Sequence, residues 1–258
     1  MDIKMIVCDL DGTLLRSNKT VSPYSLNVLE NCRKHGILLA FATARSQNGV
    51  ALYINMMQPD ILVLNGGALV KIGDKTIYQA AIDAATANNM LAMMLGHPEV
   101  GYVTAETEAG YFANYSTDKY TEYSCFRPIF TDFAQGIPCD AYKITPEITA
   151  TAAEYIAVQF PEVAFVHFSG GQWRNFTHKD ATKLKGIAAA AKHMGIDMSQ
   201  IVAFGDDHND VDMLANCGIG VAMANAIPQA KAAAEYTCGD NDNDGVARWL
   251  EENIWPQK

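Results

Sequence analysis

The chain has 258 residues, of which 49% are hydrophobic and 19% are charged, a composition typical of a globular protein rather than a disordered or fibrous one. The formal net charge of -10 argues against broad binding to nucleic acids or anionic membranes, because both require a basic surface. Six scattered cysteines without a C-x-x-C pair indicate reduced thiols rather than disulfides or zinc. No N-terminal signal pattern is present and the apolar runs are too short to span a bilayer, so we expect a cytoplasmic protein.

The first 80 or so residues predict alternating buried strands and helices. A short apolar run from Lys4 to Asp9 ends in turn residues, as strands of a parallel sheet do. Ser22 and Pro23 provide an N-cap and a first helical turn, and the helix that they begin ends at Gly36. The elements expected next are a strand at 37–42, a helix at 46–57, a strand at 61–64 and a hairpin at 68–79.

The pattern changes between about residues 83 and 178, where helices become fewer and strands follow one another. This stretch is typical of an α+β domain inserted into an α/β core. The expected helices are 83–95 and 147–159, and the expected strands are 100–104, 111–114, 141–144, 163–168 and 172–176.

The α/β alternation resumes after the insert. We therefore expect an α/β fold with a discontinuous Rossmann-like parallel-sheet core of residues 1–82 and 179–258, and an α+β cap of residues 83–178 that determines substrate specificity. The elements expected in the second half of the core are a helix at 182–194, a strand at 201–204, a helix after residue 210, a strand at 220–222 and a helix from about residue 244.

Three of the predicted core strands end in acidic or polar residues. Asp9 and Asp11 follow the first strand, Thr43 and Arg45 follow the second, and residues 205–210 follow a later one. In open α/β sheets, ligands collect at the carboxyl ends of the strands. Carboxylates gathered there would repel one another unless a cation lay among them, and their oxygen atoms suit Mg²⁺.

These residue types suit phosphoryl transfer. A carboxylate beside Mg²⁺ can attack phosphorus, so Asp9 is the predicted nucleophile and would become transiently phosphorylated. Asp11 would protonate the leaving oxygen and later take a proton from the attacking water. Lys183 would neutralise the phosphoryl oxygens, and Thr43 would donate its hydroxyl to the same group. The sequence thus predicts a phosphatase that acts on a small phosphorylated metabolite.

Several of these residues belong to short motifs. In chain order the motifs are Asp9-Leu-Asp-Gly-Thr-Leu-Leu, Thr43-Ala-Arg45, Asn65-Gly-Gly, Lys183 and Gly205-Asp-Asp-His-Asn-Asp210. Two further motifs are Gly220-Val-Ala-Met-Ala-Asn-Ala226 and Asp244-Gly-Val-Ala. The first set resembles the haloacid dehalogenase-like hydrolase superfamily, and the other two motifs resemble its Cof-type sugar-phosphatase branch. The resemblance covers nearly the whole chain.

The resemblance implies a Rossmann-like core with an α+β cap inserted after the third strand. It also implies Mg²⁺ held by the Asp9 side chain, the backbone carbonyl of Asp11 and the Asp206 side chain. Asp210 would support these ligands without binding the ion itself, and Asn209 would help to hold the phosphoryl group.

By the same resemblance, Thr43, Ala44 and Arg45 lie where the phosphate or substrate binds. The family usually has glycine in place of Ala44, and it usually has glycine after the motif lysine, where this chain has leucine and then Lys185. The spacing from the insert and from the later acidic motif favours Lys183 as the lysine that reaches the phosphate. Arg45 could equally tie the core to the insert.

A second metal-binding pattern lies near the C-terminus. Residues 240–245 together with Glu251 match the EF-hand calcium loop. An EF-hand requires a helix before the loop, whereas residues 235–239 predict a short strand and a turn, so we favour a purely structural loop. His178, where the insert rejoins the core, is a weaker candidate for a substrate contact.

Two other functions are compatible with the same aspartates. A phosphomutase of the same superfamily would return the phosphoryl group to its substrate instead of to water. A receiver-like phospho-switch would also pair a phosphorylated aspartate with a lysine, but a switch does not need an inserted lid that excludes water. Sugar phosphates are the substrates that the resemblance suggests, while pyridoxal phosphate and flavin mononucleotide stay open, as does the choice between a monomer and a homodimer.

Overall fold

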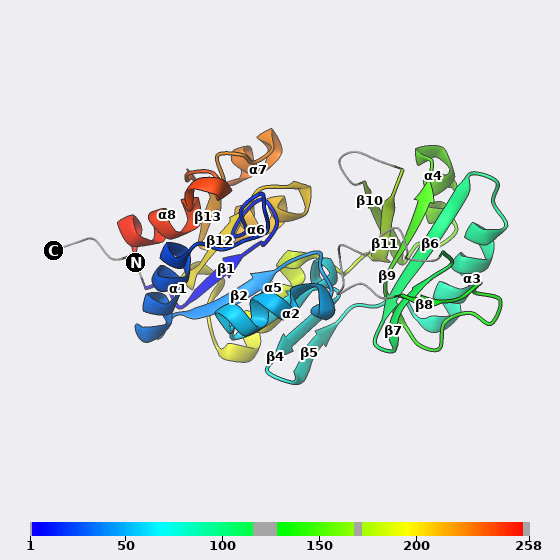
Figure 1. The fold of residues 1–258 in the computed structure, drawn as a ribbon, viewed down its shortest axis with the longest axis horizontal. Coiled ribbons are helices and arrows are strands. Elements are labelled where there is room, and N and C mark those ends of the chain that lie inside the picture. Colours follow the sequence, from blue (N-terminus) through cyan, green and yellow to red (C-terminus); the bar gives the residue numbers. More distant parts are fainter. Residues whose placement is uncertain (1, 116–127, 168–171, 255–258) are drawn as a thin grey trace. The chain divides into compact units, whose positions relative to one another are not determined.

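The computed structural model describes residues 2–115, 128–167 and 172–254. It divides the chain into two compact units, residues 1–79 with 182–258 and residues 80–181 (Figure 1). The division lies three residues from each domain boundary predicted from the sequence. An α/β unit with a largely parallel sheet is interrupted in sequence by an α+β unit, which confirms the predicted fold class.

A mixed sheet forms the centre of the first unit. Six neighbouring strands, from β14 to β3 in the order below, form five parallel pairs, and the last three strands form an antiparallel meander. The strand order is β14 (Tyr236–Thr237), β13 (Ile219–Ala222), β12 (Ile201–Gly205), β1 (Met5–Cys8), β2 (Leu38–Ala42), β3 (Ile61–Leu64), β4 (Leu69–Ile72) and β5 (Lys75–Gln79).

Helices pack on both faces of this sheet (Figure 1). The helices of the unit are α1 (Pro23–Lys34), α2 (Gln47–Met57), α5 (Lys183–Met194), α6 (Val211–Asn216), α7 (Pro228–Ala233) and α8 (Gly245–Asn253). On one face, Met5 and Val7 of β1 join Ile187 of α5 in a buried apolar cluster. On the other face, the rings of Phe204 in β12 and Trp249 in α8 lie 5.4 Å apart between centroids. Both faces of the parallel strands are therefore buried, as continuous apolar strands require.

An antiparallel sheet backed by two helices forms the second unit. Its helices, α3 (Ala84–Leu95) and α4 (Ala150–Val158), contribute Met90 and Ile156 to an apolar cluster with Ile144 and Phe176 of the sheet. All described strand pairs are antiparallel except the pair of β7 and β8. The strand order is β10 (Val163–His167), β11 (Arg174–His178), β9 (Ala141–Ile148), β6 (Val100–Thr107), β7 (Gly110–Ala113) and β8 (Ile129–Phe130).

The helix predicted at 147–159 begins later than the sequence suggests. β9 continues through this region, because Pro146 pairs with Val103 of β6. The register of β6 shifts next to Val103, and such an irregularity accommodates a proline that cannot donate to the ladder. Thr149 then caps α4 by accepting a hydrogen bond from the backbone N–H of Ala152. The prediction therefore placed the start of the helix three residues too early.

Other differences concern short elements. The sequence did not predict α7 or β8, since each has six residues or fewer and a weak periodic pattern. The strand expected at 172–176 is displaced to β11, and β6 runs three residues further than expected. Residue 168, the end of the strand expected at 163–168, lies outside the described residues. The predicted N-cap at Ser22 is confirmed, since its side chain accepts a hydrogen bond from the backbone N–H of Ser25.

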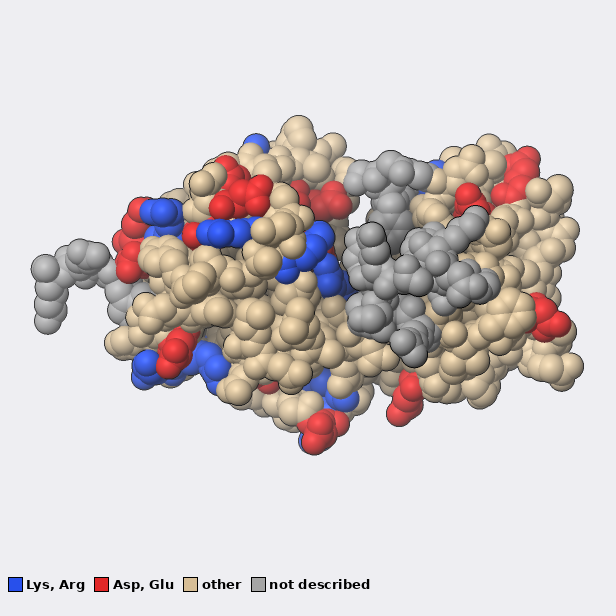
Figure 2. All heavy atoms as spheres, in the orientation of Figure 1, with Lys and Arg blue, Asp and Glu red and all other residues tan. Residues whose placement is uncertain are grey.

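Charged side chains of both signs are interspersed on the face of the molecule drawn in Figure 2. Acidic residues exceed basic ones in the chain, 29 to 19. Within the described part of the chain, no helix combines the length and the apolar character that a bilayer-spanning segment needs.

Candidate active site

The predicted site residues lie where the order of the parallel sheet reverses. From β1 the chain proceeds to β2 and β3 on one side, while β12, β13 and β14 follow one another on the other side. Asp9 directly follows β1, and its backbone N–H donates to the carbonyl of Phe204 in β12 at 3.0 Å. Asp206 and Thr43 directly follow β12 and β2, the two neighbours of β1. The topology therefore places these three side chains at adjacent strand ends, beside the crevice typical of ligand binding.

Three carboxylates form a compact cluster at this edge. Asp9, Asp206 and Asp210 each contribute an oxygen atom, and these atoms all lie within 4.8 Å of one another. The Nζ atom of Lys183 lies 2.7 Å from Oδ1 of Asp9 and 2.6 Å from Oδ1 of Asp210. The lysine side chain is only 1% exposed, so these ion pairs are shielded from water.

The start of α5 determines which of two lysines enters the cluster. Thr182 caps this helix, because its hydroxyl oxygen accepts the backbone N–H of Lys185. Lys183 is consequently the first residue of the helix and points its side chain at Asp9, whereas the side chain of Lys185 is exposed. The structure thus brings Lys183, and not Lys185, to the predicted nucleophile.

The cluster carries more negative than positive charge. Burial raises the pKa of Asp9 to about 8, with Asp210 and Asp206 adding to the shift and Lys183 opposing it. Burial likewise raises the pKa of Asp206 to about 6, with a further contribution from Asp210. Burial disfavours the ammonium of Lys183, but the charges of Asp210 and Asp9 outweigh this effect and raise its pKa. Three carboxylates thus share one lysine cation, and the surplus charge favours binding of a proton or of another cation.

Two carboxylate oxygens of the cluster are available to such a cation. Oδ1 of Asp9 is occupied by Lys183, and Oδ1 of Asp206 accepts the Thr13 hydroxyl at 2.8 Å. Among residues 2–115, 128–167 and 172–254, no hydrogen-bond donor reaches Oδ2 of either carboxylate. Gly12 makes room for Asp206, since a Cβ atom there would lie 2.3 Å from its Oδ2. Hard, unpaired oxygen atoms of this kind fit Mg²⁺.

Asp210 supports the cluster from behind. It is fully buried, and its Oδ2 atom accepts the backbone N–H groups of Asp206 at 2.9 Å and of Asp207 at 3.0 Å. Together with the ion pair to Lys183, these contacts occupy both of its oxygen atoms. Asp210 therefore holds the turn that carries Asp206, while Asn209 of the same turn is exposed.

The carboxylate of Asp11 is held apart from the cluster by two cations. Arg45 donates from Nε and Nη2 to its two oxygen atoms, each at 2.6 Å, and Lys19 donates to Oδ1 at 2.7 Å. Burial raises the pKa of Asp11, but the hydrogen bonds from Arg45 and Lys19 outweigh this effect and hold the pKa below its ordinary value. Arg45 is further fixed by the carbonyl of Gly49 and by the ring of Tyr53. In this structure Arg45 contacts the predicted general acid.

Thr43 is buried at the end of β2. Its hydroxyl oxygen accepts the backbone N–H of Arg45 at 3.2 Å, and its carbonyl accepts the N–H of Gly66 at 2.9 Å. Ala44 lies between Thr43 and Arg45 in the same turn. These contacts link the turn after β2 to the Asn65-Gly-Gly turn after β3.

The Asn65-Gly-Gly turn packs against the start of α5. A Cβ atom on Gly67 would lie 2.1 Å from the carbonyl oxygen of Thr182, so only glycine allows this approach. Asn65 has a φ of 51° and is 3% exposed, and no donor among the described residues reaches its Oδ1 atom. The turn thus shapes the surroundings of Lys183.

The loop that matches the calcium pattern, residues 240–245, together with Glu251, forms hydrogen bonds with α1 and with the segment before it. The carboxylates of Asp242, Asp244 and Glu251 all accept hydrogen bonds from protein donors. Asp244 directly precedes α8 with a φ of 58°, and its side chain makes no capping hydrogen bond to that helix. The donors are Ser17 for Asp242, Arg16 and Ser25 for Asp244, and Tyr24 for Glu251.

Polar residues of the second unit have local partners. The Nε2 atom of His178 lies 3.7 Å from Glu162, and its Nδ1 atom accepts the backbone N–H of Asp180. Lys143 pairs with Glu106 at 3.0 Å. A role for His178 in substrate binding stays a prediction.

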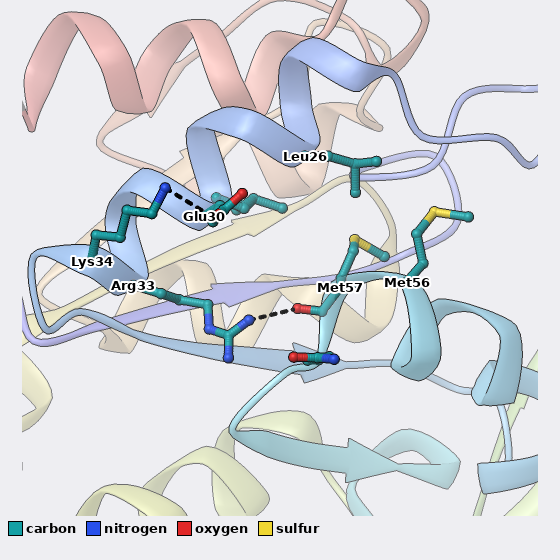
Figure 3. A pocket seen from close by; sticks show the side chains of 8 residues that line it. Leu26, Glu30, Arg33, Lys34, Met56 and Met57 are labelled. Atoms are coloured by element: carbon teal, nitrogen blue, oxygen red, sulfur yellow. Dashed lines mark hydrogen bonds and ion pairs between the residues drawn. The ribbon is translucent and has the colours of Figure 1, made fainter.

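A surface cavity of about 650 Å³ lies between α1 and α2 (Figure 3). Leu26 and Met57 contribute apolar surface, Lys34 pairs with Glu30 at 2.8 Å, and Arg33 donates to the carbonyl of Met57. None of the predicted site residues lines this cavity. It is therefore separate from the carboxylate cluster.

Sequence reasoning missed two side chains of the site. Thr13 orients Asp206, and its position in the Asp-Gly-Thr motif was the available signal. Lys19 pairs with Asp11 across a loop of irregular backbone, and no local pattern marks that contact.

Comparisons with known proteins agree with this geometry. A provisionally named phosphatase of Haemophilus influenzae is 30% identical to this chain, over 98% of the chain and 99% of the relative. The pyridoxal phosphate phosphatase of Escherichia coli is 27% identical, over 98% of this chain and 100% of the relative. A solved structure of a HAD subclass IIB sugar phosphatase is 24% identical to this chain, with a TM-score of 0.85. The match covers 96% of this chain and 98% of that one, so the two chains share a fold.

The sequence profile of the haloacid dehalogenase-like hydrolases matches residues 6–250. This match extends over both units and includes every residue of the carboxylate cluster. The chain therefore belongs to the haloacid dehalogenase-like hydrolase family, in the Cof-type branch that its motifs resemble.

Proposed function

We propose that the protein is a Mg²⁺-dependent phosphatase that hydrolyses small phosphomonoesters through an aspartyl-phosphate on Asp9. The enzyme class, a phosphoric monoester hydrolase, agrees with the family and with the phosphatase names of its relatives. One observation supports the proposal most strongly: Asp9, Asp206 and Asp210 share the single cation of Lys183 in a buried cluster. Such a cluster has both a nucleophilic carboxylate and an unmet demand for positive charge.

Asp9, Asp206 and the backbone carbonyl of Asp11 would hold the metal. Bound Mg²⁺ would screen the charge of Asp9 from that of the phosphate and polarise the phosphoryl oxygens. Asp210 would keep Asp206 in place through the two backbone N–H groups that it accepts. Lys183 would orient Asp9 through the 2.7 Å ion pair and would neutralise the phosphoryl group as it is transferred.

In the first chemical step, the carboxylate oxygen of Asp9 that does not hold the metal would attack phosphorus, and the ester P–O bond would break. The leaving oxygen would take its proton from Asp11, which must first leave its contacts with Arg45 and Lys19, bind a proton from solvent and contact the ester. In the second step, water would attack the phosphorus of the aspartyl-phosphate and transfer a proton to Asp11. The ionised state in which the two cations hold Asp11 suits this role as a base.

Sugar phosphates are the proposed substrates, and pyridoxal phosphate is the alternative suggested by a relative's name. The expected cap, residues 83–178, is proposed to select among them. The described cysteines are free thiols, which fits a reducing compartment such as the cytoplasm. Thr43, Ala44, Arg45 and Asn209 are proposed to contact the phosphate or the substrate.

The test is phosphate release from sugar phosphates, pyridoxal phosphate and flavin mononucleotide, with Mg²⁺ or with a chelator. We expect metal-dependent release that is lost in Asp9→Asn, a variant of nearly the same shape. Absence of release from every compound would contradict the phosphatase proposal. Activity that requires a bisphosphate activator and releases little phosphate would identify a mutase instead.

A further inference from the structure

Residues near the C-terminus form hydrogen bonds with the segment that closely follows the proposed nucleophile, Asp9. We call residues 12–17 the strap. The side-chain Nδ2 of Asn225 donates to the carbonyl of Gly12 at 2.7 Å, and Nδ2 of Asn241 donates to the carbonyl of Leu15 at 2.9 Å. Two amide side chains thus hold two backbone carbonyls of the strap.

Two carboxylates hold the rest of the strap. Asp242 accepts the backbone N–H of Ser17 at 2.8 Å and its hydroxyl at 2.7 Å. Asp244 accepts the guanidinium of Arg16 at 2.8 Å. Four residues thus form hydrogen bonds with the strap, and we call them the clamp: Asn225, Asn241, Asp242 and Asp244.

Further hydrogen bonds hold the residues of the clamp in place. The backbone N–H of Asn241 donates to Oδ1 of Asn225 at 3.1 Å, which links its two parts. The side chain of Asn241 is buried, and the N–H of Gly245 donates to the carbonyl of Asp240 at 3.0 Å to close the loop. The N–H groups of residues 13–16 already donate to the carbonyls of Asp9, Leu10 and Thr20, and the contacts from this loop add to them by holding the carbonyls of the strap.

We propose that the clamp is a positioning device for Asp11, and that Asn225 and Asn241 are its principal residues. Asp11 immediately precedes the strap, and its carboxylate is held by Arg45 and Lys19, contacts that must be exchanged during the reaction. Its backbone therefore needs other contacts to keep it in place while its side chain moves. The clamp supplies them at Gly12, the next residue.

This role accounts for the calcium-like sequence pattern. Asp242 and Asp244 are two of the acidic residues that make the pattern resemble an EF-hand, and both are bound to the strap. These two acidic residues thus hold the segment beside the nucleophile. The inference rests on the proposed phosphatase function, in which Asp11 is the proton donor to the leaving group.

The test separates positioning of Asp11 from general stability by varying the leaving group. p-Nitrophenolate leaves without protonation, whereas a sugar alkoxide requires a proton from the general acid. Hydrolysis of p-nitrophenyl phosphate and of a sugar phosphate would be compared in the wild type, Asn225→Ala and Asn241→Ala. Asn225 is exposed, so its variant is expected to fold even if truncation of buried Asn241 prevents folding.

Asn243→Ala is the matched control. Asn243 lies in the same loop, but its side chain donates only to Asp240 and does not contact the strap. Urea unfolding of each protein would show whether a variant is folded under the conditions of the assay. The control is expected to resemble the wild type on both esters.

We expect kcat/KM for the sugar phosphate to fall about 10- to 100-fold in the two clamp variants, and kcat/KM for p-nitrophenyl phosphate to fall less than about 3-fold, since small displacements of a catalytic group have effects of this size. Equal losses on both esters, no loss on either, or the same selective loss in the control would overturn the inference. A wild type inactive on both esters would instead contradict the proposed function.

Discussion

Lys183→Met removes the cation that pairs with Asp9 and Asp210 in the carboxylate cluster. The methionine side chain keeps the unbranched aliphatic stem, so the packing of α5 changes little while the ammonium is lost. Asp9 and Asp210 then lose partners at 2.7 and 2.6 Å in a site where the lysine is 1% exposed. Neither carboxylate gains access to water by this change.

The expected loss of stability follows from this burial. Removal of one partner of a buried ion pair typically costs about 3–5 kcal/mol, because it leaves an uncompensated buried charge. For a chain of this length that loss corresponds to a decrease in Tm of roughly 6–20 °C. Part of the loss should be recovered at low pH, because protonation of the carboxylates removes the uncompensated charge.

Urea unfolding and thermal unfolding in a chelator would measure the loss, with Lys185→Met as the matched control. Lys185 lies on the same helix with an exposed side chain, so its variant should stay within about 0.5 kcal/mol of the wild type. Phosphate release should fall about 10²- to 10³-fold in Lys183→Met, as expected when a group that stabilises transferred charge is removed, and little in the control. Wild-type stability and activity in Lys183→Met, or a larger loss in the control, would refute the reasoning.

Three further predictions concern charge and space at the cluster. Burial raises the pKa of Asp9 to about 8, so the folded protein keeps a proton on Asp9 that the unfolded chain releases near pH 4. The free energy of unfolding, measured with urea in a chelator, should therefore fall between about pH 4 and 8, and it should fall less in Asp9→Asn. Gly12→Ala would place a Cβ 2.3 Å from Asp206 and should weaken Mg²⁺ binding at least 10-fold by calorimetry; unchanged affinity would contradict this placement. Arg45→Ala should raise the pKa of Asp11 and move the limb of the pH–rate profile that Asp11 controls to higher pH, and an unmoved limb would contradict the pairing.

The strand ends of the core could be predicted because their signals are local. Asp9 and Asp206 each follow a short apolar run that forms a buried strand, and parallel strands end at one edge of the sheet. For these two side chains a few neighbouring residues determine the position. Lys183 was favoured over Lys185 by its spacing from the insert and from the later acidic motif, and the cap at Thr182 explains why it is the lysine that reaches Asp9.

The contacts that the sequence did not reveal join residues far apart in the chain. Asn241 reaches the carbonyl of Leu15 across more than two hundred residues, and its loop instead matched a calcium pattern that depends only on spacing. The ion pair between Arg45 and Asp11 depends on how two separate turns pack. The helix expected from residue 147 begins later because β9 extends to Ile148 by pairing with another strand, β6.

The most direct test of the central claim is to locate the phosphoryl group during turnover. The enzyme would be mixed with its best substrate and Mg²⁺, quenched in acid within the first turnover, digested and mapped by mass spectrometry. The account predicts a phosphoryl group on Asp9 in the wild type and none in Asp9→Asn. A phosphoryl group on another residue, or substrate turnover that persists in Asp9→Asn, would contradict it.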